Sequence, residues 1–261
     1  MRRLVLLLLM SLVVAFVGCG GSGSASKTPT TPFKPPPYPS ITGNWALTAT
    51  STVTPQVTAI GGYITNTNGG VSGILHILTS PCFAPTTDVP ITGSVTAAGA
   101  VTAVSSAVGG QTITLSGTVS SGSLTAGKYS IIGGCGNGDQ GTVTGFIAPP
   151  FTNTYTGTFQ SVSGLAIGTT INATQTGPDA NGLYAVTGTA TFTNSPCFTS
   201  ATISSSAISG AYVDLVLANN DGSQTSFVGD ITNPSGSLVS GNYQVTGGKC
   251  SGDQGSGTLS N

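Results

Sequence analysis

Apolar and polar residues alternate over many short stretches of this chain. Ile113, Leu115 and Val119 fall on one side of an extended segment, and threonine or serine fills most positions between them. The same period of two recurs in residues 89–95 and 213–217. This alternation is typical of antiparallel strands that bury one face and expose the other. Beyond the N-terminal region, no stretch keeps the period of 3.6 that marks an amphipathic helix.

Turn signals divide these stretches into short strands. They fall about every 8 to 12 residues, a spacing typical of all-β barrels and sandwiches. They include Asn68-Gly69, Gly109-Gly110, Ser121-Gly122, Asn181-Gly182 and Asp221-Gly222. We therefore expect an all-β protein.

A long internal repeat divides the body into two units. Ser80-Pro81-Cys82-Phe83 recurs as Ser195-Pro196-Cys197-Phe198, and each copy has a second cysteine 53 residues after its first. The front edge Gly43-x-Trp45 recurs 114 residues later as Gly157-x-Phe159. The repeat predicts two tandem domains of about eight strands each, residues 41–148 and 154–261, joined by a proline-containing linker at 149–153.

Glycines inside the expected strands favour barrels. They follow a hydroxyl residue in Thr92-Gly93, Ser116-Gly117, Thr144-Gly145 and Thr187-Gly188. Glycine weakens a flat strand, so its repeated use indicates sharp coiling or close backbone approach, as at the corners of a small barrel. Two antiparallel β-barrels are therefore the expected architecture, with two antiparallel sandwiches as the alternative.

Few residues are charged, and this excludes some functions. Charged residues make up 5% of the chain, there is no glutamate, and the only arginines are Arg2 and Arg3. Without those two, four lysines face seven aspartates, a net charge of −3. Such a chain has no basic patch for phosphates, so nucleic acid is not an expected partner.

The N-terminus carries an export signal. Arg2 and Arg3 precede an apolar run at residues 4–17, which ends at Gly18-Cys19. A charged start, a short apolar run and a small residue before the cut are the features of a signal peptide, here residues 1–18. Residues 19–40 are rich in glycine, serine and proline, a composition typical of an extended stalk.

The segment Phe16-Val17-Gly18-Cys19 resembles the lipobox of bacterial lipoproteins. The resemblance implies cleavage before Cys19, acylation of that cysteine and a lipid anchor in a membrane of the cell envelope. In that family an aspartate after the cysteine is associated with inner-membrane retention. Gly20 stands there, so the outer membrane is expected if the cell has two.

The remaining four cysteines form an even set suited to disulfides. Four thiols allow three pairings, and the repeat favours Cys82 with Cys135 and Cys197 with Cys250, because each unit is expected to fold alike. Cys-x-x-Cys motifs are absent, so a structural role is expected over a metal or redox role.

Other candidate chemistry is sparse. Asp139 and Asp253 each lie in Gly-Asp-Gln-Gly, where a lone carboxylate is a poor calcium site and is better explained as a turn residue. The single histidine, His76, has no counterpart in the second unit and no Gly-x-Ser-x-Gly elbow to complement it. We therefore expect no catalytic, cofactor-binding or metal-binding residues.

These observations predict a non-catalytic lipoprotein that acts by binding or by surface display. The Gly43-x-Trp45 element, together with eight expected strands, is similar to the start of lipocalins and avidin-like barrels. That resemblance implies an alternative role as carrier of a small apolar ligand, and an enzyme of unknown class is the second alternative. The membrane is the expected partner through the lipid, while the sequence does not identify a small-molecule or envelope-protein partner.

Overall fold

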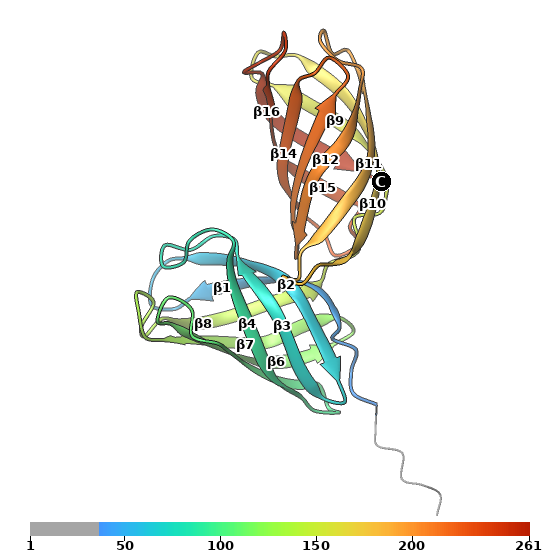
Figure 1. The fold of residues 1–261 in the computed structure, drawn as a ribbon. Helices are drawn as coiled ribbons and strands as arrows, with labels where there is room; N and C mark the ends of the chain where they lie inside the picture. Colours follow the sequence, from blue (N-terminus) through green and yellow to red (C-terminus); the bar gives the residue numbers. More distant parts are fainter. Residues whose placement is uncertain (1–36) are drawn as a thin grey trace, which may run out of the picture. The chain divides into compact units, whose positions relative to one another are not determined.

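A computed structural model describes residues 37–261 and shows two closed antiparallel β-barrels (Figure 1). The expected signal peptide, Cys19 and most of the expected stalk lie outside these residues. No helix in the described part of the chain is long and apolar enough to cross a membrane. The all-β class with two eight-stranded barrels is confirmed, and the sandwich alternative is not what the chain forms.

Barrel 1 consists of the first eight strands. They are β1 (Gly43–Ser51), β2 (Val57–Thr67), β3 (Gly70–Ile77), β4 (Thr87–Val95), β5 (Ala100–Ser105), β6 (Thr112–Ser120), β7 (Ser123–Ile132) and β8 (Gln140–Ile147). Barrel 2 consists of β9 (Asn153–Ser161), β10 (Ala166–Pro178), β11 (Tyr184–Thr193), β12 (Ser200–Ser209), β13 (Tyr212–Asn219), β14 (Gln224–Ile231), β15 (Leu238–Thr246) and β16 (Gln254–Ser260).

Each barrel has up-and-down topology. Consecutive strands pair antiparallel, and the ring closes where β1 pairs with β8 and where β9 pairs with β16. The connections β1–β2, β3–β4, β5–β6 and β7–β8 consequently lie at one end of barrel 1. The predicted turns at Asn68-Gly69 and Ser121-Gly122 lie at the opposite end.

Each core lies inside its barrel. The alternating residues Ile113, Leu115 and Val119 of β6 are all buried, as are Val213 and the other apolar positions of β13. The threonines between the apolar residues of β6 are more exposed, which is the alternation expected of a strand with a wet outer face.

The strand glycines allow neighbouring backbones to approach closely. A Cβ at Gly93 would overlap the carbonyl oxygen of Thr102, and one at Gly188 would overlap that of Asn172. Adjacent strands leave no room for a side chain at these points. The close backbone approach predicted from these residues is therefore present.

The structure corrects the alignment of the two repeats at their first strands. Val143 and Gly257 are equivalent positions of the last strands, and they pair with Ala49 and Phe159 respectively. Phe159 therefore occupies the ladder position of Ala49 and not, as the sequence pattern predicted, that of Trp45. The Gly-x-aromatic likeness is local, whereas the register is set by pairing with the last strand.

We expect Gly157→Ala to destabilise the protein by about 1–3 kcal/mol, the usual cost of forcing extra atoms into a packed site. Its Cβ would overlap the carbonyl oxygen of Thr258 on β16. Gly177→Ala is the matched control in the same barrel, because a Cβ there meets nothing within 4 Å. Urea unfolding of both variants tests this, and equal stabilities would contradict it.

Candidate functional site

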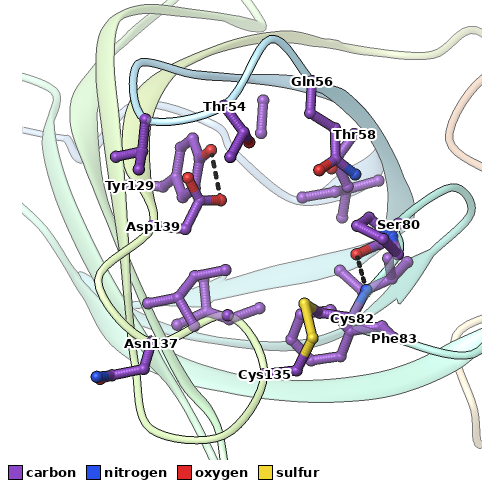
Figure 2. Close-up of a pocket in the computed structure, with 18 of the residues that line it drawn as sticks. Thr54, Gln56, Thr58, Ser80, Cys82, Phe83, Tyr129, Cys135, Asn137 and Asp139 are labelled. Carbon is purple, nitrogen blue, oxygen red and sulfur yellow. Dashed lines mark hydrogen bonds between the residues drawn. A yellow bond between two sulfur atoms is a disulfide. The ribbon is translucent and has the colours of Figure 1, made fainter.

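A cavity of about 220 Å³ opens at one end of barrel 1 (Figure 2). The loops β1–β2, β3–β4 and β7–β8 surround its mouth, and strand residues form its walls. Its apolar walls include Ala49, Ile60, Ile77, Phe83, Leu115 and Ile131. Thr54, Gln56, Ser80 and Asn137 add polar groups. An apolar interior with a few polar groups is the usual character of a small-molecule site.

A disulfide holds two of these loops together. Cys82 of the β3–β4 loop is bonded to Cys135 of the β7–β8 loop, and Cys197 is bonded to Cys250 in barrel 2. This is the pairing that the repeat predicts. In the chain-entropy account, closing a loop of this length contributes roughly 4 kcal/mol to stability. Paired disulfides also indicate an oxidising, extracytoplasmic compartment.

Gln111 ties the same two loops in barrel 1 by hydrogen bonds. Its side chain donates from Nε2 to the carbonyl oxygen of Cys82 at 3.1 Å, and its Oε1 accepts from the amide of Gly136 at 2.8 Å. Gln111 is 2% exposed. The role of Gln111 could not be predicted from the sequence, because a glutamine in a turn gives no signal of its long-range partners.

Asp139 braces the cavity wall. Its carboxylate accepts hydrogen bonds from Ser51 Oγ at 2.6 Å and from Tyr129 Oη at 3.0 Å, which links the ends of β1 and β7 to the start of β8. Asp253 accepts from Ser161 and Tyr243 in the same way in barrel 2. Both aspartates do end a backbone turn, since their amides donate to the carbonyl oxygens of Gly136 and Cys250. Their side chains, however, bond to residues of other strands and not within the turn.

The histidine, cysteine and aspartate side chains of the described residues are dispersed. No group of three or more histidine, cysteine, aspartate or glutamate side chains gathers anywhere in residues 37–261. Asp139 and Asp253 use their carboxylates in the two braces.

The corresponding end of barrel 2 is filled by aromatic rings. Ala49 has Phe159 as its ladder equivalent. Ile77 has Phe192 as its equivalent, because Ile77 pairs with Ile60 and Phe192 pairs with Thr169, the residue equivalent to Ile60. Leu115 has Phe227 as its equivalent, because they pair with the equivalent tyrosines Tyr129 and Tyr243. Three positions on the cavity wall of barrel 1 thus carry phenylalanine in barrel 2.

These phenylalanines form one packed cluster. The ring of Phe159 stacks on Phe227 with centroids 5.4 Å apart and on Tyr243 at 4.8 Å, and Phe192 meets Phe198 edge-on at 4.8 Å. Phe159 and Phe227 are at most 1% exposed. At this end, barrel 1 has aromatic rings only at the two positions that both copies share, Phe83 and Tyr129. The space that the other rings fill in barrel 2 is the cavity of barrel 1.

The phenylalanines are visible in the sequence, but their significance depends on the strand register. Both copies show an apolar residue at each of the three positions, so alternation alone makes them equivalent core residues. Only the strand pairing shows that a phenylalanine ring in barrel 2 takes the place of a smaller aliphatic side chain in barrel 1.

His76 does meet a serine and an aspartate, at the contact between the barrels. Both barrels belong to one compact unit. His76 Nδ1 lies 2.8 Å from Ser209 Oγ of β12, and its Nε2 lies 3.3 Å from Asp88 Oδ1 of β4. Burial lowers the pKa of His76, and the Asp88 carboxylate opposes that shift.

This constellation has the residue types of a catalytic triad but not its access. Ser209 is 2% exposed and His76 is 1% exposed, so a substrate could not reach the hydroxyl in this arrangement. Beside it, Asn44 donates to the carbonyl oxygen of Gly210 at 2.9 Å and accepts from its amide at 2.6 Å. The geometry supports a role in joining the barrels.

Comparisons with known proteins add little. No protein-family model and no curated protein sequence matches the chain. Among solved structures, the chain is similar to a protein of unknown function from the DUF3598 family of Nostoc punctiforme PCC 73102. The two are 12% identical, the match covers 84% of this chain and 94% of that chain, and the TM-score is 0.24. A likeness of this size carries no argument about fold or function.

We expect the free energy of unfolding to fall as pH rises from about 10 to about 12. Burial raises the pKa of Tyr243 from 10.0 to about 12 and also raises that of Tyr129. Below pH 10 the phenols are neutral in both states, and above it the unfolded state ionises first, which removes stability. Urea unfolding at several pH values measures this. Tyr243→Phe is expected to lose stability less steeply, and an equal slope would contradict the assignment.

Proposed function

We propose that this protein is a lipid-anchored protein of the cell envelope that binds a small, mainly apolar ligand at the disulfide end of barrel 1. The observation that carries the proposal is the open cavity at positions where the duplicate barrel holds three phenylalanines. Well-packed protein interiors contain few voids larger than a water molecule. A cavity of this size at a barrel end that aromatic rings fill in the other copy favours a binding role over surface display.

The size of the cavity limits the ligand. An engineered apolar cavity of about 150 Å³ in another protein accommodates benzene. At about 220 Å³, the cavity in barrel 1 has room for a single ring with a short substituent. Transfer of such a group from water to the aliphatic walls is favourable, so burial of the apolar part drives binding.

The disulfides and the N-terminal motif support the proposed location. The disulfides fit an oxidising compartment outside the cytoplasm. The lipobox-like segment ending at Cys19 fits an acyl anchor, and the proline-rich stalk would hold the barrels away from the bilayer.

We expect Ala49→Phe to weaken binding of 2-phenylethanol by more than about tenfold while the protein remains folded. The new ring would enter the cavity as Phe159 enters the equivalent space in barrel 2. Isothermal titration calorimetry measures the affinity, and urea unfolding checks the fold.

Thr48→Phe is the matched control for this substitution. Thr48 neighbours Ala49 on β1 but is exposed, so a ring there adds the same mass outside the barrel. Binding should be unchanged in that variant. Leu115→Phe repeats the test from another wall, and retained binding in both folded cavity variants would contradict the proposed site.

We expect Cys19→Ala to move the protein from the membrane fraction to the soluble fraction of cells. The substitution removes the thiol that the acyl chain would modify. Fractionation with immunoblotting measures the distribution, with a Cys82→Ala and Cys135→Ala double variant as a control that keeps Cys19. Retention of Cys19→Ala in the membrane fraction would contradict the lipid anchor.

A further inference from the structure

We infer that the ligand of barrel 1 carries no negative charge: it is a small amphiphile with an apolar ring or chain and one alcohol, phenol or amine group that faces Asp139. The inference rests on the proposed function and names the chemical class that this cavity takes. Its basis is the distribution of charge and hydrogen-bonding capacity around the cavity.

The cavity wall contains a carboxylate and no cation. Asp139 is the one charged residue among those that line the cavity. The described residues include two lysines and no arginine. Lys128 is exposed on β7 next to the inward-facing Tyr129, and Lys249 belongs to barrel 2, so neither lines the cavity. An anionic ligand would lose its hydration beside a like charge without gaining a cationic partner, which is unfavourable.

Hydrogen bonding at this wall favours a donor on the ligand. Each carboxylate oxygen of Asp139 accepts one protein hydrogen bond, from Ser51 or Tyr129, and a carboxylate oxygen has two acceptor positions. The Ser51 hydroxyl donates to Asp139 and also accepts from the amides of Val53 and Thr54. The Ser51 and Tyr129 protons are thus committed to Asp139, and the unused capacity at this wall belongs to acceptors.

In barrel 2 an aromatic ring covers the interior side of the same brace. Asp253, Tyr243 and Ser161 repeat its hydrogen bonds, but the ring of Phe159 stacks on Tyr243 at 4.8 Å. In barrel 1 the equivalent residue is Ala49, and Figure 2 shows open space between the Tyr129–Asp139 pair and the disulfide. The brace is common to both barrels, whereas its exposure to a cavity belongs to barrel 1.

Three probes that share one carbon skeleton test the charge preference at pH 7: 2-phenylethanol, 2-phenylethylamine and phenylacetate. Titration calorimetry on the intact protein should show binding of the alcohol and the amine, with phenylacetate at least about tenfold weaker than both. Phenylacetate binding as tightly as the alcohol would overturn the inference and leave the proposed function standing. No binding by any of the three would remove the proposed function, and the inference with it.

Asp139→Asn identifies the group responsible. The substitution keeps the shape and removes the charge, so phenylacetate should approach the affinity of 2-phenylethanol while the amine binds more weakly. Asp253→Asn is the matched control, because it alters the identical brace in barrel 2 and should leave all three affinities unchanged. A folded Asp139→Asn protein that still discriminates against phenylacetate as strongly as the unmodified protein would overturn the role of Asp139.

Discussion

Closure of the strand ladder is the constraint on which the rest of this structure depends. Pairing of β1 with β8, and of β9 with β16, leaves neither barrel with a free sheet edge. A closed ring of eight strands also fixes the space that side chains must fill. The strand glycines belong to the same constraint, because a Cβ at Gly93 or Gly157 would collide with the carbonyl of the neighbouring strand. A chain with so few charges thus avoids edge-to-edge association by geometry.

Because both barrels have eight strands, the side chains determine whether a barrel is filled or hollow. At the disulfide end, barrel 2 places phenylalanine at positions 159, 192 and 227, and barrel 1 places Ala49, Ile77 and Leu115 on the same ladder positions. Truncating a buried phenylalanine to alanine typically costs about 3–5 kcal/mol in other proteins. Barrel 1 nevertheless keeps the same strand number and pairing order, so the duplicate serves as an internal reference for what the cavity lacks.

The sequence predicted those features that follow from local periodicity and from the repeat. Alternation such as Ile113, Leu115 and Val119 predicts strands, and the twin 53-residue spacings predict Cys82 with Cys135 and Cys197 with Cys250. The cavity could not be predicted in this way, because it depends on which residues share a ladder position. The Gly-x-aromatic likeness aligned Phe159 with Trp45, and only pairing with β16 reveals that it stands opposite Gly257, in the place of Ala49. Gln111 and the partners of Asp139 were hidden for the same reason, since their contacts span long stretches of chain.

The loops around the cavity show how a barrel end can remain open yet ordered. In barrel 2, ring stacking around Phe159 packs the interior beneath the loops. Barrel 1 lacks that packing. Its β3–β4 and β7–β8 loops are joined by a disulfide, as the equivalent loops of barrel 2 are, and also by the two hydrogen bonds of Gln111. Because these ties lie in the wall and not in the lumen, they stabilise the loops without occupying the space between them. The Asp139 brace stabilises the opposite wall in the same way, and its carboxylate also lines the cavity.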